Sequence, residues 1–446
     1  MEYIKEALNH IKEKDVNEKE FIQAVEEVLN SVDVIFAQNP QYQNKGIIER
    51  LVEPERIIQF RVPWEDDQGK IHVNRGFRVQ FNGVLGPYKG GLRFNPTVNL
   101  SIMKFLGFEQ VFKNALTGMP IGGGKGGSDF DPKGRSDNEI KRFCNSFMTE
   151  LYRHIGPDID VPAGDMGVGS KEIGYLYGHY RRLRGTSERG VLTGKGLGYG
   201  GSLVRKEATG YGVIYFLNEI LKRINKSLSK QRIVISGSGN VAIYTAEKAK
   251  EYDGHVIAMS DSKGYIIDEQ LDLDVVKLIK EVKREGLSLY PQISGHGEYY
   301  VGSLYDHLGL KYDIAIPCAT QNEIDIKRAK NIYDSSCKIV VEGANMPNDN
   351  DAIMYYQEKG IIFVPGKASN AGGVATSALE MSQNSMRYNW TFTEVDEKLR
   401  TIMQDIHQQC LMAIEAYKLN EYDYVKAANI AGVSLVINAM ISQGDY

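Results

Sequence analysis

Three lysines stand in glycine-rich or aromatic surroundings early in the chain, where their ammonium groups could bind a small anion. Lys89 lies in Gly-Pro-Tyr-Lys-Gly-Gly, Lys113 ends Phe-Glu-Gln-Val-Phe-Lys, and Lys125 lies in Gly-Gly-Gly-Lys-Gly-Gly. Glycine lets the backbone approach a ligand closely, and a lysine held near other cations has a lowered pKa that suits acid–base chemistry. We therefore expect a pocket for an anionic small molecule, although a single lysine is by default a solvated surface residue.

An aspartate follows these lysines in Val-Pro-Ala-Gly-Asp, which ends at Asp165. Taken alone, this aspartate could simply be the N-cap of a helix. We expect the neighbouring Asp158 and Asp160 to be ordinary surface or capping carboxylates. The glycine-rich lysine frame is not a nucleotide triphosphate-binding loop, because Met119 and Gly126 occupy the positions of its first glycine and its Ser or Thr.

A second glycine motif, Gly-Ser-Gly-Asn-Val-Ala at residues 237–242, follows an apolar run and opens a helix-forming stretch. The first glycine of such a motif makes the turn, and the second lets backbone amides approach a pyrophosphate at the helix N-terminus. The alternative is an ordinary strand-to-helix turn, but motif and context together favour a dinucleotide cofactor. The expected cofactor contacts are Gly237, Ser238, Gly239, Asn240 and Val241.

The end of the next expected strand, Ser260-Asp261-Ser262-Lys263, bears on which dinucleotide binds. Asp261 lies about 20 residues beyond the loop, where an acid usually binds the ribose hydroxyl of NAD. Ser260, Ser262 and Lys263 are instead good partners for the 2′-phosphate of NADP. The local chemistry leaves both cofactors open.

The elements around these motifs predict an α/β protein. We expect helices at 18–36, 99–117 and 136–154 and a β-hairpin made by 57–64 and 71–81, from their apolar periodicity. From residue 213, strands and helices alternate, which predicts a parallel sheet with helices on both faces. The glycine-rich stretch 190–212 is either a mobile domain junction or a structureless surface loop.

Composition excludes several other classes of protein. The 446 residues carry a net charge of −4, which does not favour nucleic acid as a partner. The four cysteines and eight histidines are scattered without metal-ligand spacing, so we expect no metal site and a reducing, cytoplasmic compartment. Because the N-terminal residues are charged and helical in pattern, we expect no signal peptide there. We find no apolar run near the ~20 residues needed to cross a bilayer, so we expect no membrane partner.

The chain resembles the hexameric glutamate dehydrogenases along essentially its whole length. The motifs that carry this resemblance are Gly86–Phe94, Lys113, Gly122–Asp131, Leu151–Gly169, Ser202–Gly212, Pro317–Asp325, Glu342–Pro347 and Pro365–Asn384. Relatives that act on leucine, valine or phenylalanine are similar around Gly-Gly-Lys-Gly-Gly. They have apolar residues where Lys89 and Ser377 stand here, and an apolar pocket would not bury an unpaired cation.

The resemblance implies a role for each matching residue. Lys125 would be the catalytic lysine and Asp165 the proton-transfer acid. The substrate-binding residues would be Lys89 and Ser377 for the side-chain carboxylate, and Lys113, Gln110 and the backbone at Gly164 for the α-carboxylate. Thr209, Asn240 and Asn345 would hold the nicotinamide half of the cofactor, with Asp261, Ser262 and Lys263 at its adenosine end.

The resemblance also implies the architecture and the reaction. A mixed-sheet substrate domain would comprise residues 1–200 and the C-terminal helices 370–446, and a Rossmann-like cofactor domain would comprise 201–369, with the active-site cleft between them. The expected enzyme is a cytoplasmic homohexamer that interconverts glutamate with 2-oxoglutarate and ammonium. We expect NADP as cofactor, from the likeness of 235–240 and 260–264 to NADP-dependent members, with NAD as the alternative. The rival functions are an aliphatic amino-acid dehydrogenase and a non-catalytic dinucleotide-responsive regulator.

Overall fold

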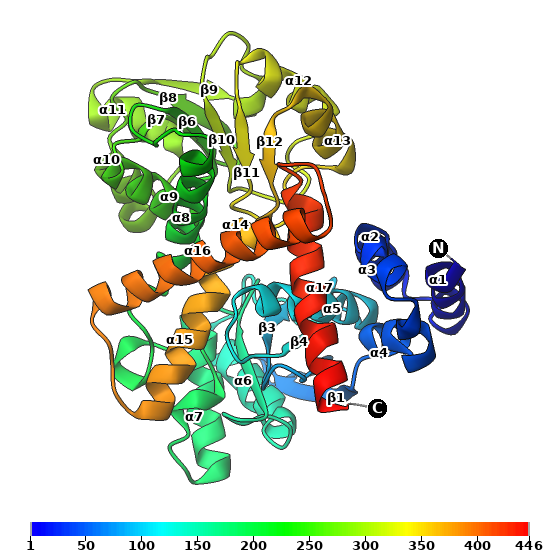
Figure 1. Cartoon of the computed structure of the whole chain (residues 1–446). Coiled ribbons are helices and arrows are strands. Elements are labelled where there is room, and N and C mark those ends of the chain that lie inside the picture. Colours follow the sequence, from blue (N-terminus) through cyan, green and yellow to red (C-terminus); the bar gives the residue numbers. More distant parts are fainter. Residues whose placement is uncertain (1, 445–446) are drawn as a thin grey trace. The chain divides into compact units, whose positions relative to one another are not determined.

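The structure, a computed structural model, describes residues 2–444 and consists of two compact units (Figure 1). The first unit comprises Met1–Leu203, Val374–Val395 and Asn429–Tyr446, and the second comprises Val204–Gly373 and Asp396–Ala428. Both units are therefore built from segments that are distant in the sequence. The first boundary lies inside the glycine-rich stretch 190–212, but residues 191–193 of this stretch are fully buried, so it is not a structureless surface loop.

The first unit begins with short helices that bury one apolar face each. They are α1 (Glu2–Lys14), α2 (Lys19–Ser31), α3 (Asp33–Gln38), η1 (Pro40–Lys45) and α4 (Ile47–Val52). The helix expected at 18–36 is interrupted at Val32, which has φ −115° and ψ 17°. The apolar stripe predicted there is nevertheless buried, with Phe21, Val25 and Leu29 all at most 1% exposed.

A five-stranded mixed sheet with the order β1-β2-β4-β3-β5 forms the centre of the first unit. Its strands are β1 (Arg56–Glu65), β2 (Ile71–Asn82), β3 (Tyr88–Phe94), β4 (Gly123–Ser128) and β5 (Asp160–Gly164). β1 and β2 form the predicted antiparallel hairpin. β3 runs parallel to both of its neighbours, β4 and β5. The carboxyl ends of these three strands therefore lie at one edge of the sheet.

Helices that follow the strands cover this sheet. They are α5 (Leu100–Leu116), α6 (Asp137–Leu151), α7 (Ser170–Arg184), η2 (Arg189–Val191) and η3 (Leu197–Tyr199). The Asn99 side chain caps α5 by accepting a hydrogen bond from the amide of Ile102. Ser136 and Glu139 form a reciprocal capping box at the start of α6. These caps explain why the two helices begin where the sequence predicted them.

The second unit contains a seven-stranded sheet with the order β12-β11-β10-β6-β7-β8-β9. Its strands are β6 (Arg232–Ser236), β7 (His255–Ser260), β8 (Gly264–Ile267), β9 (Glu298–Val301), β10 (Ile314–Pro317), β11 (Ile339–Val341) and β12 (Ile362–Val364). The first five strands in this order, β12 to β7, are parallel to one another, as the alternation of strands and helices in the sequence predicted. β8 and β9 add an antiparallel edge. The sequence did not indicate this edge, because both strands are only four residues long and β9 is not buried.

Helices and short turns connect the strands of the second unit. They are α8 (Ala208–Arg223), α9 (Asn240–Glu251), α10 (Leu273–Lys277), η4 (Leu278–Lys283), η5 (Leu287–Leu289), α11 (Tyr290–Ser294), η6 (Leu304–Asp306), α12 (Ile326–Asp334), α13 (Asn350–Lys359) and α14 (Gly366–Ser369). α8 and α9 approach closely at Gly210, where an added Cβ would lie 2.5 Å from the amide nitrogen of Thr245.

The C-terminal region is helical, as expected, but it does not belong to one unit. Its helices are α15 (Gly372–Met386), α16 (Phe392–Ala416) and α17 (Tyr424–Gln443). The sequence interpretation gave all of 370–446 to the first domain, whereas the structure assigns Asp396–Ala428 to the second unit. The reason is that α16 packs on α8, where Tyr215 donates a hydrogen bond to Asp396 at 2.5 Å and Gln404 donates to Glu219 at 3.0 Å.

α17 corrects the expectation that no apolar run could cross a membrane. Among residues 2–444, this 20-residue helix has a mean hydropathy of 1.5 and is long and apolar enough to do so. Just over half of its apolar window (56%) is buried in the protein. Asn429 donates a hydrogen bond to Ser31 Oγ at 2.7 Å, and a Cβ on Gly432 would lie 2.7 Å from the carbonyl oxygen of Phe112. From Asn429 onwards, α17 therefore packs as a helix of the first unit.

Candidate active site

The three-strand edge of the first unit brings together residues that lie far apart in the sequence. Lys89 is on β3, Lys125 is on β4, and Asp165 directly follows β5. β3 lies between the other two strands, with Leu92 paired to Gly126 on one side and to Gly164 on the other. Strand order therefore places Lys125 and Asp165 on either side of β3.

Lys125 and Asp165 form an ion pair across Gly91. Lys125 Nζ lies 2.8 Å from Asp165 Oδ2, and the lysine is only 6% exposed. A Cβ on Gly91 would lie 2.8 Å from Asp165 Cβ and 3.4 Å from Lys125 Nζ, so only glycine leaves room for the pair. Arg93 Nε donates to the same carboxylate oxygen at 3.0 Å. Arg93 was not predicted as a site residue. The one feature that could have indicated it is its position shortly after Lys89 in the same glycine-rich segment.

The two cations determine the charge of Asp165. Burial acts to raise the pKa of this carboxyl, but the charges of Lys125 and Arg93 outweigh it and lower the pKa to about 2. Asp165 is therefore a carboxylate at neutral pH in this structure. It can accept a proton first, and it can donate one only after it has done so, which refines its expected role as an acid.

Lys89 is a buried cation with fixed hydrogen-bond partners. It is 1% exposed, and its Nζ donates to the carbonyl oxygen of Val161 at 3.0 Å and to Thr193 Oγ1 at 2.8 Å. A buried ammonium without polar partners would be strongly unfavourable. Thr193 is fully buried and was not singled out from the sequence. Ser377, which the resemblance assigned to the same pocket, is 2% exposed in α15.

The last turns of α5 lie directly on the glycine-rich strand β4. A Cβ on Gly123 would lie only 2.4–2.6 Å from atoms of Val111, so the helix can sit here only because position 123 is glycine. Gln110 donates to Asn114 Oδ1 at 2.7 Å, and Asn114 in turn donates to the carbonyl oxygen of Lys89 at 3.0 Å. These bonds attach the helix that carries the half-buried Lys113 to strand β3.

Asp160 corrects the expectation of a surface or capping carboxylate. Its side chain and that of Arg78 are both fully buried and form a salt bridge. Arg78 Nε donates to Asp160 at 2.8 Å, Gln80 donates to it at 3.0 Å, and Arg78 Nη1 donates to the carbonyl oxygen of Gly90 at 3.1 Å. This network joins β2, β5 and the carbonyl oxygen of Gly90, the residue that follows Lys89 on β3. The backbone of Gly164, at the end of β5, is tightly packed, because a Cβ there would lie 2.5 Å from the carbonyl oxygen of Val168.

The dinucleotide motif in the second unit has the predicted strand–turn–helix context. Gly237 follows β6 with φ +91°, a conformation that favours glycine, and its amide donates to Ser260 Oγ at 2.8 Å. A Cβ on Gly239 would meet no atom within 4 Å, so space is open at the N-terminus of α9. Asn240 begins this helix and is exposed, whereas Ser238 is buried and Val241 is half-buried. Open space at a helix N-terminus suits a pyrophosphate.

Two further expected cofactor residues lie at helix starts and loops of the second unit. Thr209 is in the first turn of α8, and a Cβ on Gly373 would lie 2.7 Å from its Oγ1. Asn345 is exposed, and its Oδ1 accepts a hydrogen bond from Asn370 Nδ2 at 2.8 Å. Asn370 also donates to the carbonyl oxygen of Ala344 at 3.2 Å, so it fixes the loop that carries Asn345.

Asp261 is bound to the backbone of its own turn. Its Oδ1 accepts from the amides of Lys263 at 2.9 Å and Gly264 at 3.1 Å, and its Oδ2 accepts from the amide of Leu287 at 2.7 Å. Both oxygens therefore already have partners, and the carboxylate stabilises the turn instead of projecting from it. Ser262 and Lys263 are exposed on the same turn. The structure also brings in Lys280, whose Nζ lies 4.0 Å from Asp261 Oδ2.

Glu342, which opens the motif before Asn345, is a buried carboxyl that the sequence did not mark as special. It is 3% exposed and accepts hydrogen bonds from Asn348 Nδ2 at 2.9 Å and from the amide of Gly366 at 2.7 Å. Burial raises its pKa to about 7, although these hydrogen bonds and the charge of Lys367 partly oppose the shift. Its function here is to fix the backbone of the loop.

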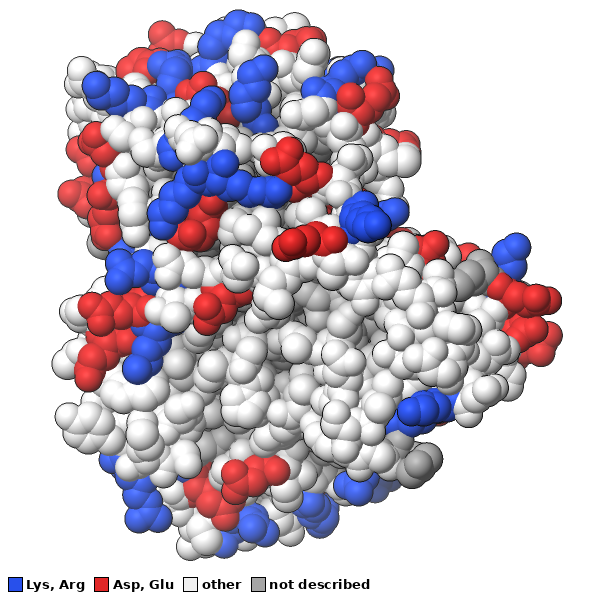
Figure 2. Space-filling model, viewed as in Figure 1, with Lys and Arg blue, Asp and Glu red and all other residues white. Residues whose placement is uncertain are grey.

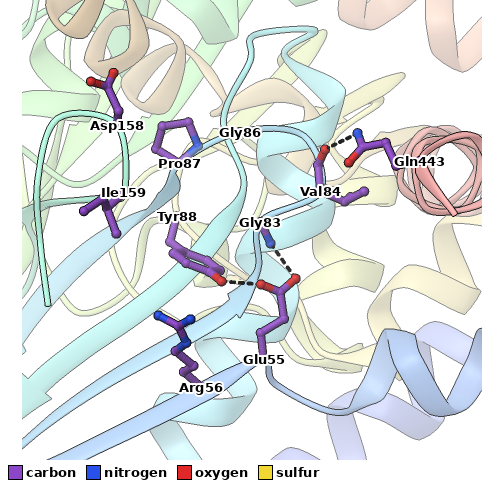
Figure 3. Close-up of a pocket in the computed structure, with 10 residues that line it drawn as sticks. All are labelled: Glu55, Arg56, Gly83, Val84, Gly86, Pro87, Tyr88, Asp158, Ile159 and Gln443. Atoms are coloured by element: carbon purple, nitrogen blue, oxygen red, sulfur yellow. Dashed lines mark hydrogen bonds between the residues drawn. The ribbon is translucent and has the colours of Figure 1, made fainter. Parts of the chain in front are cut away.

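A cavity of about 640 Å³ in the first unit lies apart from these residues (Figure 3). Its charged lining residues are Glu55, Arg56 and Asp158, so it does not present a cluster of cations. Figure 3 shows Tyr88, the residue before Lys89, donating a hydrogen bond to Glu55 in this cavity. Among residues 2–444, no group of three or more His, Cys, Asp or Glu side chains could hold a metal ion.

Family models, known proteins and solved structures all match this chain, and together the matches cover essentially its whole length. A family model described as Glu/Leu/Phe/Val dehydrogenase, dimerisation domain, matches residues 54–182, and one described as Glutamate/Leucine/Phenylalanine/Valine dehydrogenase matches 200–444. The NADP-specific glutamate dehydrogenase of Giardia intestinalis is 52% identical, over 99% of this chain and 98% of that protein. The NAD-specific glutamate dehydrogenase of Clostridium symbiosum is 49% identical, over 99% of both chains. A solved structure of Plasmodium falciparum glutamate dehydrogenase 2 superposes with a TM-score of 0.96 at 51% identity, covering 100% of this chain and 97% of that one.

Proposed function

The chain belongs to the glutamate/leucine/phenylalanine/valine dehydrogenase family, and we propose that it is an NADP-dependent glutamate dehydrogenase. The reaction is reversible: L-glutamate, water and NADP⁺ give 2-oxoglutarate, ammonium, NADPH and a proton. The observation that carries the choice of glutamate is the buried ammonium of Lys89, held by Val161 and Thr193. A carboxylate is the substrate group that binds an ammonium most strongly, because the hydrogen bond between them is charge-assisted.

The substrate is held by its two carboxylates. Lys89, with Ser377, binds the side-chain carboxylate, and Lys113, with Gln110 and the backbone at Gly164, binds the α-carboxylate. Two charged anchors fix both ends of a dicarboxylate and so orient its Cα. Orientation of this kind contributes up to ~7–11 kcal/mol to lowering a barrier in ideal cases.

Lys125 and Asp165 move the protons. When bound, the nicotinamide supplies the hydride acceptor for the Cα hydrogen of glutamate. Lys125 then polarises the water that attacks the resulting iminium and stabilises the oxygen of the carbinolamine, while a proton of this water passes to Asp165. Asp165, ionised beside Lys125 and Arg93, accepts a proton and returns it to the departing amino nitrogen.

The second unit has the features that a dinucleotide requires. The Gly237 turn, the open space at Gly239 and the start of α9 fit a pyrophosphate. In this proposal Thr209, Asn240 and Asn345 hold the nicotinamide half. The geometry of Asp261 favours NADP, because its oxygens accept three backbone amides while Ser262 and Lys263 are exposed to receive a 2′-phosphate. NAD is the alternative, and a relative that uses it is nearly as similar as those that use NADP.

Assembly and location extend the proposal. We propose a homohexamer, and Figure 2 supports an interface by showing a broad area without charged side chains over α17. The cores of protein interfaces are depleted in charged residues. We also propose a cytoplasmic location, because Cys144, Cys318, Cys337 and Cys410 are free and buried.

The decisive experiment measures initial rates at 340 nm with 2-oxoglutarate and ammonium, using NADPH and NADH at equal concentrations. We expect NADPH to be oxidised faster. The same assay with 4-methyl-2-oxopentanoate, which lacks the second carboxylate, should give at least tenfold lower kcat/KM. No turnover of 2-oxoglutarate with either cofactor would overturn the enzyme assignment, and faster use of NADH would overturn only the cofactor.

A further inference from the structure

A second buried ion pair lies next to the Lys89 pocket and has no part in the mechanism above. Lys195 and Glu380 have fully buried side chains, and Lys195 Nζ lies 2.6 Å from Glu380 Oε1. Taking two charges out of water is costly, and an apolar pair of similar size is often at least as stable. Because burying this ion pair costs free energy, stability alone does not explain why a lysine and a glutamate occupy these two positions.

The carboxylate of Glu380 organises the backbone around the pair. It accepts hydrogen bonds from the amides of Gly194 at 3.0 Å and Lys195 at 3.4 Å, and Lys195 Nζ also donates to the carbonyl oxygen of Leu192. Gly194 has φ +84°, so the chain turns sharply at this point. The pair thus fixes both the residue before and the residue after Thr193.

Thr193 connects this turn to Lys89. Its amide donates to the carbonyl oxygen of Pro162 on β5 at 3.0 Å, and its hydroxyl accepts from Lys89 Nζ at 2.8 Å. Glu380 also lies three residues after Ser377 on α15, and residues three apart share one face of a helix. One carboxylate therefore links the helix that carries Ser377 to the turn that holds Lys89.

We infer that Lys195 and Glu380 are positioning residues for the side-chain carboxylate pocket, acting on Lys89 through Thr193. This inference rests on the proposed function, because it concerns how well the enzyme distinguishes dicarboxylic from monocarboxylic substrates. If the pair is lost, Thr193 is no longer held against Lys89, and the ammonium can leave the geometry that a second carboxylate requires. A substrate without that carboxylate should be affected less.

The test replaces the pair by apolar residues in Lys195→Met with Glu380→Leu. The matched control replaces another largely buried pair of the same unit in Lys104→Met with Glu18→Leu, where Lys104 is 4% exposed.

The assays measure KM and kcat with 2-oxoglutarate and with 2-oxopentanoate, which has the same five carbons but no second carboxylate. Loss of one hydrogen bond to a charged group predicts a roughly tenfold or larger fall in the preference for 2-oxoglutarate. The fall should appear as a higher KM for 2-oxoglutarate and unchanged KM for NADPH and ammonium.

A variant at Thr193 tests the inference even if the protein with Lys195→Met and Glu380→Leu does not fold. Thr193→Val leaves the ion pair intact and should cause the same loss of preference, whereas Thr193→Ser should restore it. An equal fall for both substrates, or a Thr193→Val enzyme with the wild-type preference, would overturn the inference. A wild-type protein that does not turn over 2-oxoglutarate would instead overturn the proposed function.

Discussion

The two units hold their key carboxylates in opposite electrostatic surroundings. In the first unit, two cations within 3.0 Å lower the pKa of Asp165 to about 2. In the second unit, Glu342 accepts hydrogen bonds from the side-chain amide of Asn348 and the backbone amide of Gly366, and burial raises its pKa to about 7. The first unit is thus organised by fixed side-chain charges, and the second by backbone geometry. This difference suits their proposed ligands, since carboxylates need cations while a pyrophosphate can bind amide groups at a helix N-terminus.

The largest expected effect comes from removing a charge at the reacting centre of the first unit. Lys125→Ala should lower kcat by about 10²–10⁴-fold, the range for a general acid–base group. KM for glutamate should change much less, because Lys89 and Lys113 remain. Steady-state kinetics measure both, with Lys171→Ala as a control at an exposed lysine of the same unit. A variant with near wild-type kcat would contradict the assignment of Lys125.

The next test converts the charged pocket into an apolar one. Lys89→Leu with Ser377→Val should reduce kcat/KM for glutamate by about one to two decades, because a charge-assisted interaction of ~1.5–3 kcal/mol is lost. Activity towards norleucine should rise relative to glutamate. The control is Ser382→Val on the same helix, whose hydroxyl donates a hydrogen bond to the carbonyl oxygen of Ala378. Survival of the glutamate preference would show that Lys89 is not the anchor for the side-chain carboxylate.

A smaller effect is expected where the second unit does use side-chain charge. Ser262→Ala with Lys263→Ala should weaken use of NADPH by about tenfold, since a contact to the 2′-phosphate is lost. Use of NADH should barely change. The comparison is kcat/KM for both cofactors in the wild type, this variant and Lys226→Ala, an exposed lysine elsewhere in the unit. An unaltered NADPH to NADH ratio would mean that Asp261 governs the choice of cofactor after all.

The smallest effect concerns stability against pH. A raised pKa means that the contribution of Glu342 to stability is complete below its unfolded pKa of about 4.3 and is lost as the pH rises through about 7. Glu342→Gln should remove this loss and flatten the change in Tm between pH 5 and 8 by a few degrees. Asp165→Asn should leave that range unaltered, because a lowered pKa costs stability only as the pH falls from about 4 towards 2. Tm is measured by thermal unfolding at each pH for the wild type and both variants. An equal slope of Tm against pH for the wild type and Glu342→Gln would contradict the difference proposed between Glu342 and Asp165.

Sequence reasoning succeeded where a feature depends on neighbouring residues. The hairpin of β1 and β2, the positions of α5 and α6, and the Gly237 turn between β6 and α9 all follow from local periodicity and local conformational preference. The same reasoning identified the glycine frames, whose small residues let α5 and β3 approach β4. Family resemblance supplied the roles of the site residues, which local patterns did not.

Sequence reasoning failed where the residue that determines the surroundings of a side chain lies far away in the sequence. Asp160 looked like a surface carboxylate, because nothing near it in the sequence reveals Arg78 as its buried partner. Residues 396–428 were assigned to the wrong unit, since only the contacts of α16 with α8 show where they pack. Lys195 and Glu380 are 185 residues apart, so neither attracts attention by itself. Asp261 matched the expected spacing, yet the amide of Leu287 helps to hold it in its turn.

The position of α17 has a consequence for how a cell must make this protein. The first unit uses residues up to 203 and then needs 429–443 to cover α5. A ribosome adds about 5–20 residues per second, so roughly 10 to 50 seconds separate the synthesis of these segments. During that interval the nascent first unit exposes the apolar surface that α17 later buries, while the whole of the sheet in the second unit emerges. The first unit is therefore begun first, yet it completes its fold only when the last helix of the chain has been made.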